Sequence, residues 1–395
     1  MILYKSFNPF KKGSRIIEKS RSSPLPLTLR KNGRIDESDI PFPLMKRGKG
    51  PYIYDYDDNR FVDFYLSNGS LLLGHSHPGI TKIIKSWLNR GYASGYMAAS
   101  HEALSKRAFR MLSGKNLDNE FKEGKWIYYD SCHEAAWSVL CILNCIGYSG
   151  TGIYIAKYDK PENCSPFDNI LIKKVDPKDL NTVNFTNLNF VIIRIDEKIS
   201  KAQTNILLKM QNEKGLIIIS DETGFECHVH GIHNRTLLNN PDMRVFGSWI
   251  SCGLSFGCVY AKSSLFKKIQ DHNNSKLFQT TLLNSVPPIY KIKAVIASLK
   301  ILEKYGGVEG LLKKNKYFYG MLNNKYFCLI DGLVYEKQGN FLTKEYKKIH
   351  SELLEKGFYF PLSPVSPVFI SYSHSNELLE ESAVRINLLF DGLYR

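Results

Sequence analysis

The segment Asp130–Ala135 contains residue types that could hold a phosphate group. It lies between a short apolar stretch and a run with helical spacing, which predicts a turn from a strand into a helix. The free N–H groups of a helix N-terminus, together with the Ser131 hydroxyl, suit an anion. The pattern also has a simpler interpretation, because Ser131 followed by Glu134 is a capping box.

Asp221, a second candidate, directly follows the apolar segment 216–220. A carboxylate at a strand end can hold the protonated nitrogen of a pyridine ring, which lets the ring act as an electron sink. The alternative is a structural role, in which Asp221 caps the next element. A third loop, 241–253, has the pattern of a strand that leads into a tight glycine turn at Gly247 and Ser248.

A cluster of potential metal ligands follows the Asp221 loop. It consists of one cysteine and three histidines within seven residues, namely Cys227, His228, His230 and His233. On a strand, His228 and His230 would share one face, an arrangement that suits zinc or copper. The alternative is an ordinary polar loop, which is favoured because the sequence offers no distant fourth ligand.

Strands and helices must alternate to position these loops. Residues 52–64 alternate apolar and polar positions around an Asp/Asn turn and predict a β-hairpin. Gly215 is placed to end a helix just before the strand at 216–220. The remaining expected elements are helices at 79–89, 134–146 and 290–304 and strands at 126–129 and 190–194.

The alternation of apolar strands with helices predicts an α/β fold, with a parallel sheet covered on both faces. The carboxyl edge of such a sheet is where chemistry is expected, and the three candidate loops fall there. The pattern changes near residue 290. We therefore expect an N-terminal basic arm and hairpin segment (1–75), a large domain (76–289) and a small C-terminal domain (290–395).

The order and spacing of these motifs resemble the class-III aminotransferases, and most closely the glutamate-1-semialdehyde 2,1-aminomutase branch. Ser131–Ala135 is similar to S-G-[ST]-E-A, and Asp221–Phe225 is similar to D-E-V-x-T-G-F-R with two residues missing. The other matching segments are 48–78, 278–281, 357–361 and 369–375. The likeness covers most of the chain.

The resemblance implies a fold-type-I transferase that uses pyridoxal 5'-phosphate (PLP), with a mostly parallel central sheet flanked by helices and a smaller α+β C-terminal domain. By this resemblance, Ser131, Cys132 and His133 would hold the cofactor phosphate, and Asp221 would hold the pyridine nitrogen. Thr281 would reach the phosphate from a neighbouring subunit, so a dimer is expected.

The chain departs from the family where the family binds PLP covalently. In P-D-I-x-x-x-G-K the lysine follows the glycine, whereas here Ser248 follows Gly247. A lysine amine forms the Schiff base and then moves the α-proton, and a serine hydroxyl can do neither. In addition, Cys132 replaces the phosphate-cup glycine, the Y-H-G motif has no counterpart, and Arg194-Ile195 replaces E-P.

Two hypotheses follow. The first is a degenerate aminotransferase without catalytic residues, which keeps the fold, forms a homodimer or a heterodimer with an active relative, and binds a small amine or amino acid. The second is an enzyme that binds PLP or pyridoxamine phosphate (PMP) non-covalently and acts on an amino acid or amino sugar. The combination of Ser248, Cys132 and the missing Y-H-G motif favours the first.

The bulk composition limits the partners. The net charge is +15, and residues 1–34 hold nine Lys/Arg and one acid, Glu18. This segment is expected to be a solvated basic arm, with a transit peptide or a phosphate-binding arm as alternatives. No apolar run reaches the roughly 18 residues of a membrane span, and no secretion signal is evident. A cytoplasmic protein with reduced cysteines and no nucleic-acid or membrane partner is expected.

Overall fold

The computed structural model describes residues 44–91, 96, 98–112, 124–148, 150–155, 170–194, 200–233, 241–271, 286–337 and 343–393. Contacts divide the chain into two compact units. One contains Met1–Pro78 and Tyr305–Arg395, and the other is Gly79–Lys304. The helix α12 (Ile289–Lys304) therefore falls in the second unit, whereas the sequence-based boundaries grouped residues 290–304 with the C-terminal residues.

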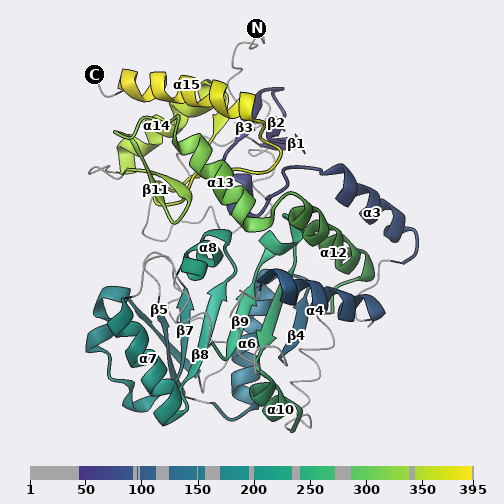
Figure 1. Cartoon of the computed structure of the whole chain (residues 1–395), viewed down its shortest axis with the longest axis vertical. Helices are drawn as coiled ribbons and strands as arrows, with labels where there is room; N and C mark the ends of the chain where they lie inside the picture. Colours follow the sequence, from purple (N-terminus) through teal and green to yellow (C-terminus); the bar gives the residue numbers. More distant parts are fainter. Residues whose placement is uncertain are drawn as a thin grey trace, which may run out of the picture. The chain divides into compact units, whose positions relative to one another are not determined.

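The unit Gly79–Lys304 is built on a seven-stranded sheet (Figure 1). Each pair of neighbouring strands is parallel except where β10 takes part, because β10 runs antiparallel to both β4 and β9. The mostly parallel sheet predicted from the sequence is therefore confirmed. In spatial order the strands are β4 (Lys125–Tyr129), β10 (Gly257–Ala261), β9 (Met243–Phe246), β8 (Ile217–Glu222), β7 (Leu188–Arg194), β5 (Gly150–Ile155) and β6 (Ile170–Val175).

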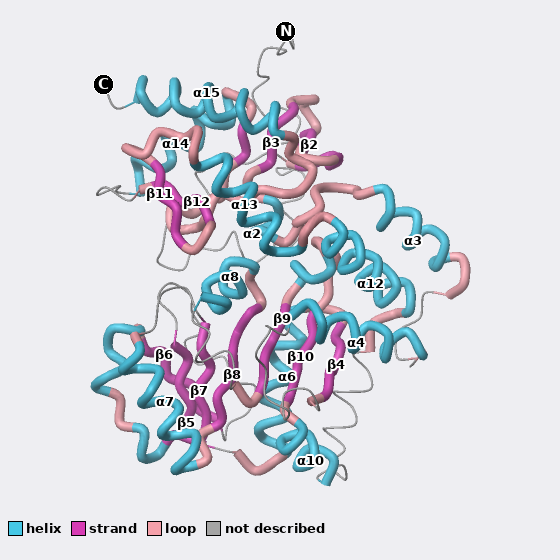
Figure 2. Tube along the Cα trace, in the orientation of Figure 1, coloured by secondary structure: helices cyan, strands magenta, loops and turns pink. Residues whose placement is uncertain are grey.

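Helices cover both faces of this sheet, as Figure 2 shows for α6 (Cys132–Cys145) and α7 (Lys201–Lys214). Successive residues of a strand point to opposite faces, so one strand serves both layers. Ile217 and Ile219 of β8 pack with the α6 residues, whereas Ile218 packs with Leu207 of α7. This explains why the strand reads as a continuous apolar run.

The other helices of this unit are α3 (Pro78–Leu88), α4 (Ala99–Leu112), α8 (Phe225–His233) and α10 (Ser263–Asp271), with 3-10 turns η3 (Pro177–Thr182), η4 (Phe185–Asn187) and η5 (Ser248–Ser251). The predicted end of α7 is confirmed, because Gly215 caps it in the left-handed region at φ 68°. No helix of the described ranges is long and apolar enough to cross a membrane.

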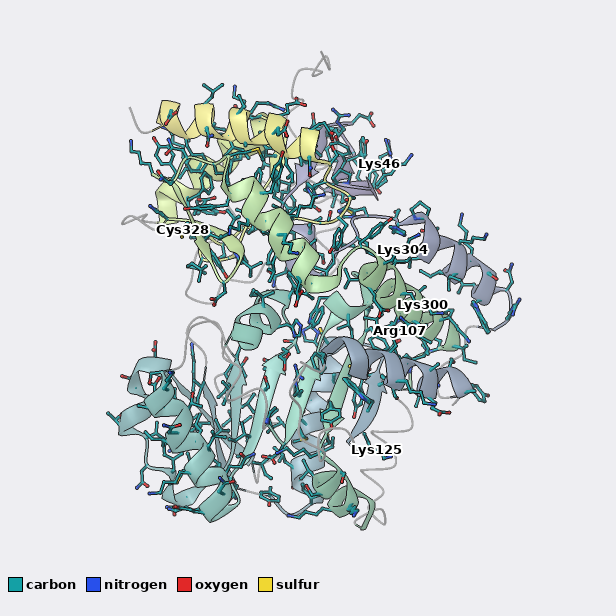
Figure 3. All side chains as sticks on the ribbon, in the orientation of Figure 1. Lys46, Arg107, Lys125, Lys300, Lys304 and Cys328 are labelled. Atoms are coloured by element: carbon teal, nitrogen blue, oxygen red, sulfur yellow. The ribbon has the colours of Figure 1, made fainter. Side chains whose placement is uncertain are left out.

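Cations are numerous on the surface of this unit. They include Arg107 of α4 and two residues of α12, Lys300 and Lys304 (Figure 3). Arg107 pairs with Glu303 at 2.5 Å, so part of this charge is neutralised within the unit.

The other unit has a four-stranded sheet of β1 (Met45–Lys49), β2 (Tyr52–Asp55), β3 (Arg60–Asp63) and β13 (Phe358–Tyr359). The predicted hairpin is confirmed by the antiparallel pairing of β2 with β3. Its turn is organised by Asp55, whose carboxylate accepts hydrogen bonds from the backbone N–H groups of Asp57 and Asn59. This is the local bonding that favours Asp in tight turns.

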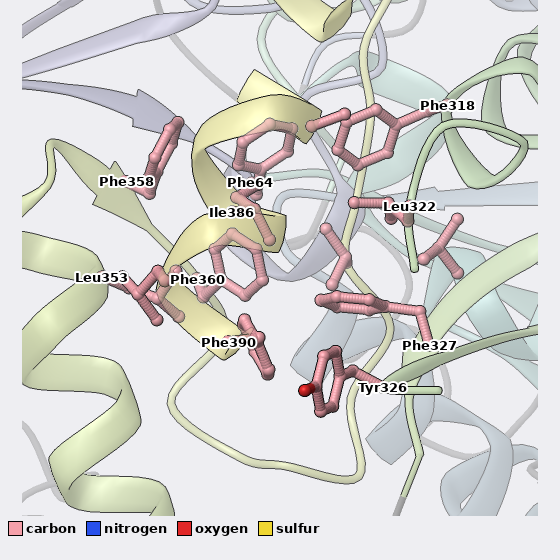
Figure 4. Packing of buried hydrophobic residues seen from close by; sticks show 14 of the residues in the cluster. Phe64, Phe318, Leu322, Tyr326, Phe327, Leu353, Phe358, Phe360, Ile386 and Phe390 are labelled. Atoms are coloured by element: carbon pink, nitrogen blue, oxygen red, sulfur yellow. The ribbon is translucent and has the colours of Figure 1, made fainter. Parts of the chain in front are cut away.

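An aromatic core holds this unit together (Figure 4). Phe64, which follows β3, stacks on Phe318 with ring centroids 5.4 Å apart and meets Phe360 edge-on at 5.4 Å. These contacts join the end of β3 to residues 254 and 296 positions later in the chain. The remaining elements are α2 (Leu66–Gly69), α13 (Gly307–Tyr319), β11 (Phe327–Ile330), β12 (Leu333–Glu336), α14 (Thr343–Glu355) and α15 (Asn376–Leu393).

Glu336 gives this unit a pH-dependent stability. Its Oε2 atom is buried without a hydrogen-bond partner in the described chain, and burial raises its pKa from 4.5 to about 8. Between these values the folded state keeps a proton that the unfolded state has lost. The stability contributed by Glu336 is therefore complete below pH 4.5 and is lost as the pH rises towards 8, by at most about 1.4 kcal/mol per pH unit.

We expect Glu336→Gln to remove this slope in urea unfolding between pH 6.5 and 8, while the exposed Glu355→Gln retains it. Below pH 6.5 the buried histidines oppose the effect, because burial lowers the pKa of His350 to about 4 and that of His374 to about 3. Equal slopes for the wild type and Glu336→Gln above pH 6.5 would contradict the assignment.

Candidate functional site

The carboxyl edge of the large sheet brings the ends of several strands together. Arg194, the last residue of β7, is in register with Asp221 of β8, and Asp221 is in register with Val245 of β9. Strand β4 has the same direction as β9, since both run antiparallel to β10. The residues that follow β4, starting with Asp130, therefore lie at this same edge.

Ser131 begins helix α6 as its N-cap residue. Its side chain accepts a hydrogen bond from the backbone N–H of Glu134 at 3.2 Å, and Glu134 accepts one from the backbone N–H of Asp130 at 3.0 Å. The capping role considered in the sequence is therefore present. A phosphate role for Ser131 is a prediction that depends on the N–H groups of the same turn.

Cys132 and His133 belong to the first turn of α6. A Cβ atom on Gly257 would lie 2.5 Å from the Ser131 carbonyl oxygen and 2.8 Å from the Cys132 Cα, so only glycine allows β10 to approach this turn. Burial raises the pKa of the Cys132 thiol, and the charge of Asp221 adds to this effect. Cys132 therefore lies within electrostatic range of Asp221, whereas His133 is exposed.

Asp221 has several partners in the protein. Its Oδ1 accepts hydrogen bonds from the Thr223 N–H at 3.0 Å and the Thr223 hydroxyl at 2.7 Å. Its Oδ2 accepts one from the Tyr154 hydroxyl at 2.8 Å and lies 3.9 Å from the Arg194 guanidinium. Burial raises the pKa of the Tyr154 phenol, and the charge of Asp221 adds to this, so the phenol stays protonated and donates.

Arg194 also pairs with Glu226 of α8, with 3.1 Å between Arg194 Nη2 and Glu226 Oε1. Burial alone lowers the pKa of the guanidinium, but Cys227, Asp221 and Glu226 raise it well above its ordinary value. Arg194 is therefore a permanent cation between two carboxylates.

Ser248 lies at the same edge, as the first residue of the 3-10 turn η5 after β9. Gly247 before it passes so close to β8 that a Cβ atom would lie 2.2 Å from the Thr223 carbonyl oxygen. Thr223 is hydrogen-bonded to the Asp221 carboxylate. The backbone of Gly247 contacts Thr223, and Ser248 is the next residue, so Ser248 lies beside the Asp221 loop. This close approach explains why the glycine is required there.

The positions of Lys262 and Lys291 relative to this edge show whether either amine is near the candidate site. Lys262 follows β10, and its N–H bonds the carbonyl of Asp242, the residue before β9. Its ammonium lies 3.7 Å from the Asp242 carboxylate, which places it at the opposite edge, about 13 Å away along a four-residue strand at ~3.3 Å per residue. Lys291 of α12 lies nearer the site, with its Nζ 2.5 Å from the Asp130 carboxylate.

A buried ionic network is centred on Glu222, the last residue of β8 and the neighbour of Asp221 in the chain. Arg244 of β9 makes a bidentate pair with Glu222 of β8, at 2.6 Å and 2.7 Å. His228 Nδ1 lies 2.7 Å from the same carboxylate, and the Trp249 indole N–H donates to the Glu222 carbonyl. Burial would raise the pKa of Glu222, but Arg244 and His228 lower it to about 2.

The Cys227–His233 cluster is neither the favoured polar loop nor the strand considered for metal binding, because these residues belong to helix α8. On a helix, positions two apart do not share a face. His228 instead packs on Trp249, with ring centroids 4.3 Å apart, and burial lowers its pKa. The described residues hold no group of three potential metal ligands, while the side chains of His230 and His233 lie outside them.

Several predicted site residues are thus close together, and some contacts were missed. The edge collects Ser131, Cys132, His133, Asp221 and Ser248, whereas Thr281 lies outside the described residues. The sequence did not predict Tyr154, the Arg194–Glu226 pair or Lys291 at this edge. A usable signal existed for Arg194, because it is a charged residue at the end of an apolar strand.

The class of protein follows from this arrangement. A mostly parallel sheet with helices on both faces and site residues at its carboxyl edge is the architecture of the fold-type-I PLP transferases. A β-phenylalanine aminotransferase from Variovorax paradoxus has this fold, with a TM-score of 0.74 at 16% identity over 97% of this chain and 94% of the other. A glutamate-1-semialdehyde aminomutase from Pseudomonas aeruginosa PAO1, a lysine-to-alanine variant in complex with PMP, gives 0.72 at 14% over 97% and 95%.

The chain is similar to the class-III aminotransferases. The family model "Aminotransferase class-III" matches residues 35–136. A glutamate-1-semialdehyde 2,1-aminomutase from Sulfurihydrogenibium sp. is 23% identical over 385 residues, which cover 86% of this chain and 89% of the relative. The resemblance found in the sequence is therefore confirmed at the level of the family.

The family is PLP-dependent, and the residues at the edge fit this cofactor only in part. The α6 N-terminus and Asp221 stand where the phosphate and the pyridine nitrogen would be held. The described residues of the edge contain no amine placed to bind PLP covalently, because Lys262 lies at the opposite edge and Lys291 is bonded to Asp130.

The Glu222–Arg244 pair should dominate the stability of the edge. Glu222→Ala leaves a buried guanidinium without its main partner, and we expect a loss of about 3–5 kcal/mol in the free energy of unfolding, measured with urea. Glu213→Ala, which removes an exposed i,i+4 partner of Lys209, should leave stability nearly unchanged. Similar losses in the two variants would show that the buried pair has no special role.

Proposed function

We propose that this chain is a class-III aminotransferase relative of the aminomutase branch that does not catalyse PLP chemistry, because Ser248 stands at the position of the Schiff-base lysine. The observation that carries the proposal is the position of Ser248. Ser248 follows Gly247, whose backbone closely approaches Thr223 beside Asp221. Ser248 therefore lies at the edge where the reacting amine would be needed. A serine hydroxyl cannot form an imine and is too weak a base at neutral pH.

The chain's own residues would keep the site structurally intact. Gly247 and Gly257 maintain the close approach of the loops, and Asp221 is bonded on both oxygens. The fold is thus preserved where the reactive group is absent. This combination supports a binding or regulatory role, with a small amine or amino acid as the ligand.

The proposal extends to partners and location. Within the family resemblance, the segment 278–281 reaches the phosphate of a neighbouring subunit, which favours a homodimer or a heterodimer with an active relative. A cytoplasmic location is part of the proposal. No nucleic-acid or membrane partner is proposed.

A second function, non-covalent use of PLP or PMP as an enzyme on an amino acid or amino sugar, is favoured by one observation. Asp221 and the α6 N-terminus are retained at the edge. The structural relative from Pseudomonas aeruginosa supports this alternative, since its lysine-to-alanine variant is described in complex with PMP.

The loss of covalent binding can be tested directly. The purified protein is incubated with PLP, scanned near 420 nm, reduced with borohydride and mapped by peptide mass spectrometry. We expect no lysine adduct and no transamination, because Lys262 and Lys291 are engaged by Asp242 and Asp130. An adduct at any lysine, together with turnover of an amino donor, would overturn the proposal.

The alternative is tested by calorimetry with PMP. If the site uses PMP as an enzyme cofactor, the wild type should bind it and Asp221→Ala should bind at least tenfold more weakly, since the carboxylate would hold the ring nitrogen. Absence of binding in both proteins eliminates the alternative and leaves the first proposal standing.

A further inference from the structure

The carboxyl edge contains two part-buried carboxylates, Asp221 and Glu226, that contact the same guanidinium. The side chains of Asp221 and Glu226 are each 13% exposed. Removing a carboxylate from water is costly unless a counter-charge and hydrogen bonds compensate for it. A site that depended on a bound ligand for this compensation would be destabilised whenever the ligand was absent.

Arg194 supplies such a counter-charge from within the chain. Its guanidinium lies 3.1 Å from Glu226 and 3.9 Å from Asp221, and its own side chain is 16% exposed. The register between Arg194 and Asp221 fixes this placement through the backbone. Tyr154 adds a hydrogen bond to the same Asp221 oxygen that faces Arg194.

The position of this cation matters for any ligand. A cationic ring whose positive nitrogen approached Asp221 would also approach Arg194, and like charges in a poorly hydrated site repel strongly. By the family resemblance, Arg194 also stands where the family has the acid of E-P, so the charge at this position is positive instead of negative. The edge therefore has a cation at Arg194 and an uncharged side chain at Ser248.

We propose that Arg194 is a resident counter-cation that completes the charge balance of Asp221 without a cofactor, so that the site disfavours a pyridinium ring. The inference rests on the proposed function and deepens it. The site then takes ligands that bring no positive charge to Asp221, that is, neutral or anionic small molecules, or an amine whose ammonium lies elsewhere.

The proposal is tested with charge variants, by thermal unfolding and by calorimetry with PMP. Arg194→Gln removes the cation, Arg194→Lys retains it, and Arg194→Gln/Asp221→Asn removes both charges. Without ligand, we expect Arg194→Gln to lower Tm by at least about 2 °C and the double variant to recover most of this loss. PMP should bind Arg194→Gln at least tenfold more tightly than it binds the wild type, while Arg194→Lys should behave like the wild type.

Two outcomes would overturn the inference. They are additive Tm losses in the double variant and an affinity of Arg194→Gln for PMP that equals that of the wild type. If Arg194→Gln does not fold, the double variant decides, since the proposal requires that removal of the second charge restores folding. A failure here leaves the proposed function intact, because that proposal fails only through a lysine adduct with turnover in the wild type.

Discussion

The pairing of β7, β8 and β9 in parallel is the constraint on which the rest of the site depends. Parallel register places the last residues of neighbouring strands at one edge, so Arg194, Asp221 and the Gly247 turn meet although they are separated in the chain. The strand ends are held by continuous backbone hydrogen bonds and a core filled on both faces. Side chains at this edge can therefore change without disturbing the scaffold, which is why a fold can outlast its original chemistry.

Charge balance is the second theme of the structure. At the end of β8, Glu222 pairs with Arg244 and His228, while Asp221 and Glu226 share Arg194. Glu222, Asp221 and Glu226 thus each have an arginine from the same chain within ion-pair distance. In an enzyme that relies on a cofactor, part of this balance comes from the bound molecule. The described arrangement is consistent with a site that is stable on its own.

Local patterns predicted much of the fold because local physics determines them. The hairpin at residues 52–64, the glycine cap at Gly215 and the helix at the end of the large unit all depend on a few neighbouring residues. The Cys227–His233 segment shows the limit of this approach. The sequence favoured an ordinary polar loop over a strand there, but Phe225, Cys227 and Val229 are buried residues of a helix. Packing with distant residues set a conformation that the local pattern did not predict.

The sequence by itself determined the family, the order of the elements and the identity of the residue after Gly247. These depend on motifs and spacing, which are linear properties of the chain. Only the tertiary structure decided what surrounds Asp221. Tyr154 and Arg194 contact that carboxylate although they lie 67 and 27 positions before Asp221 in the chain. The strand register that creates these contacts cannot be predicted from the neighbouring residues. The pairing of distant strands placed the charges around Asp221. The local sequence motifs showed only where in the chain the site residues occur.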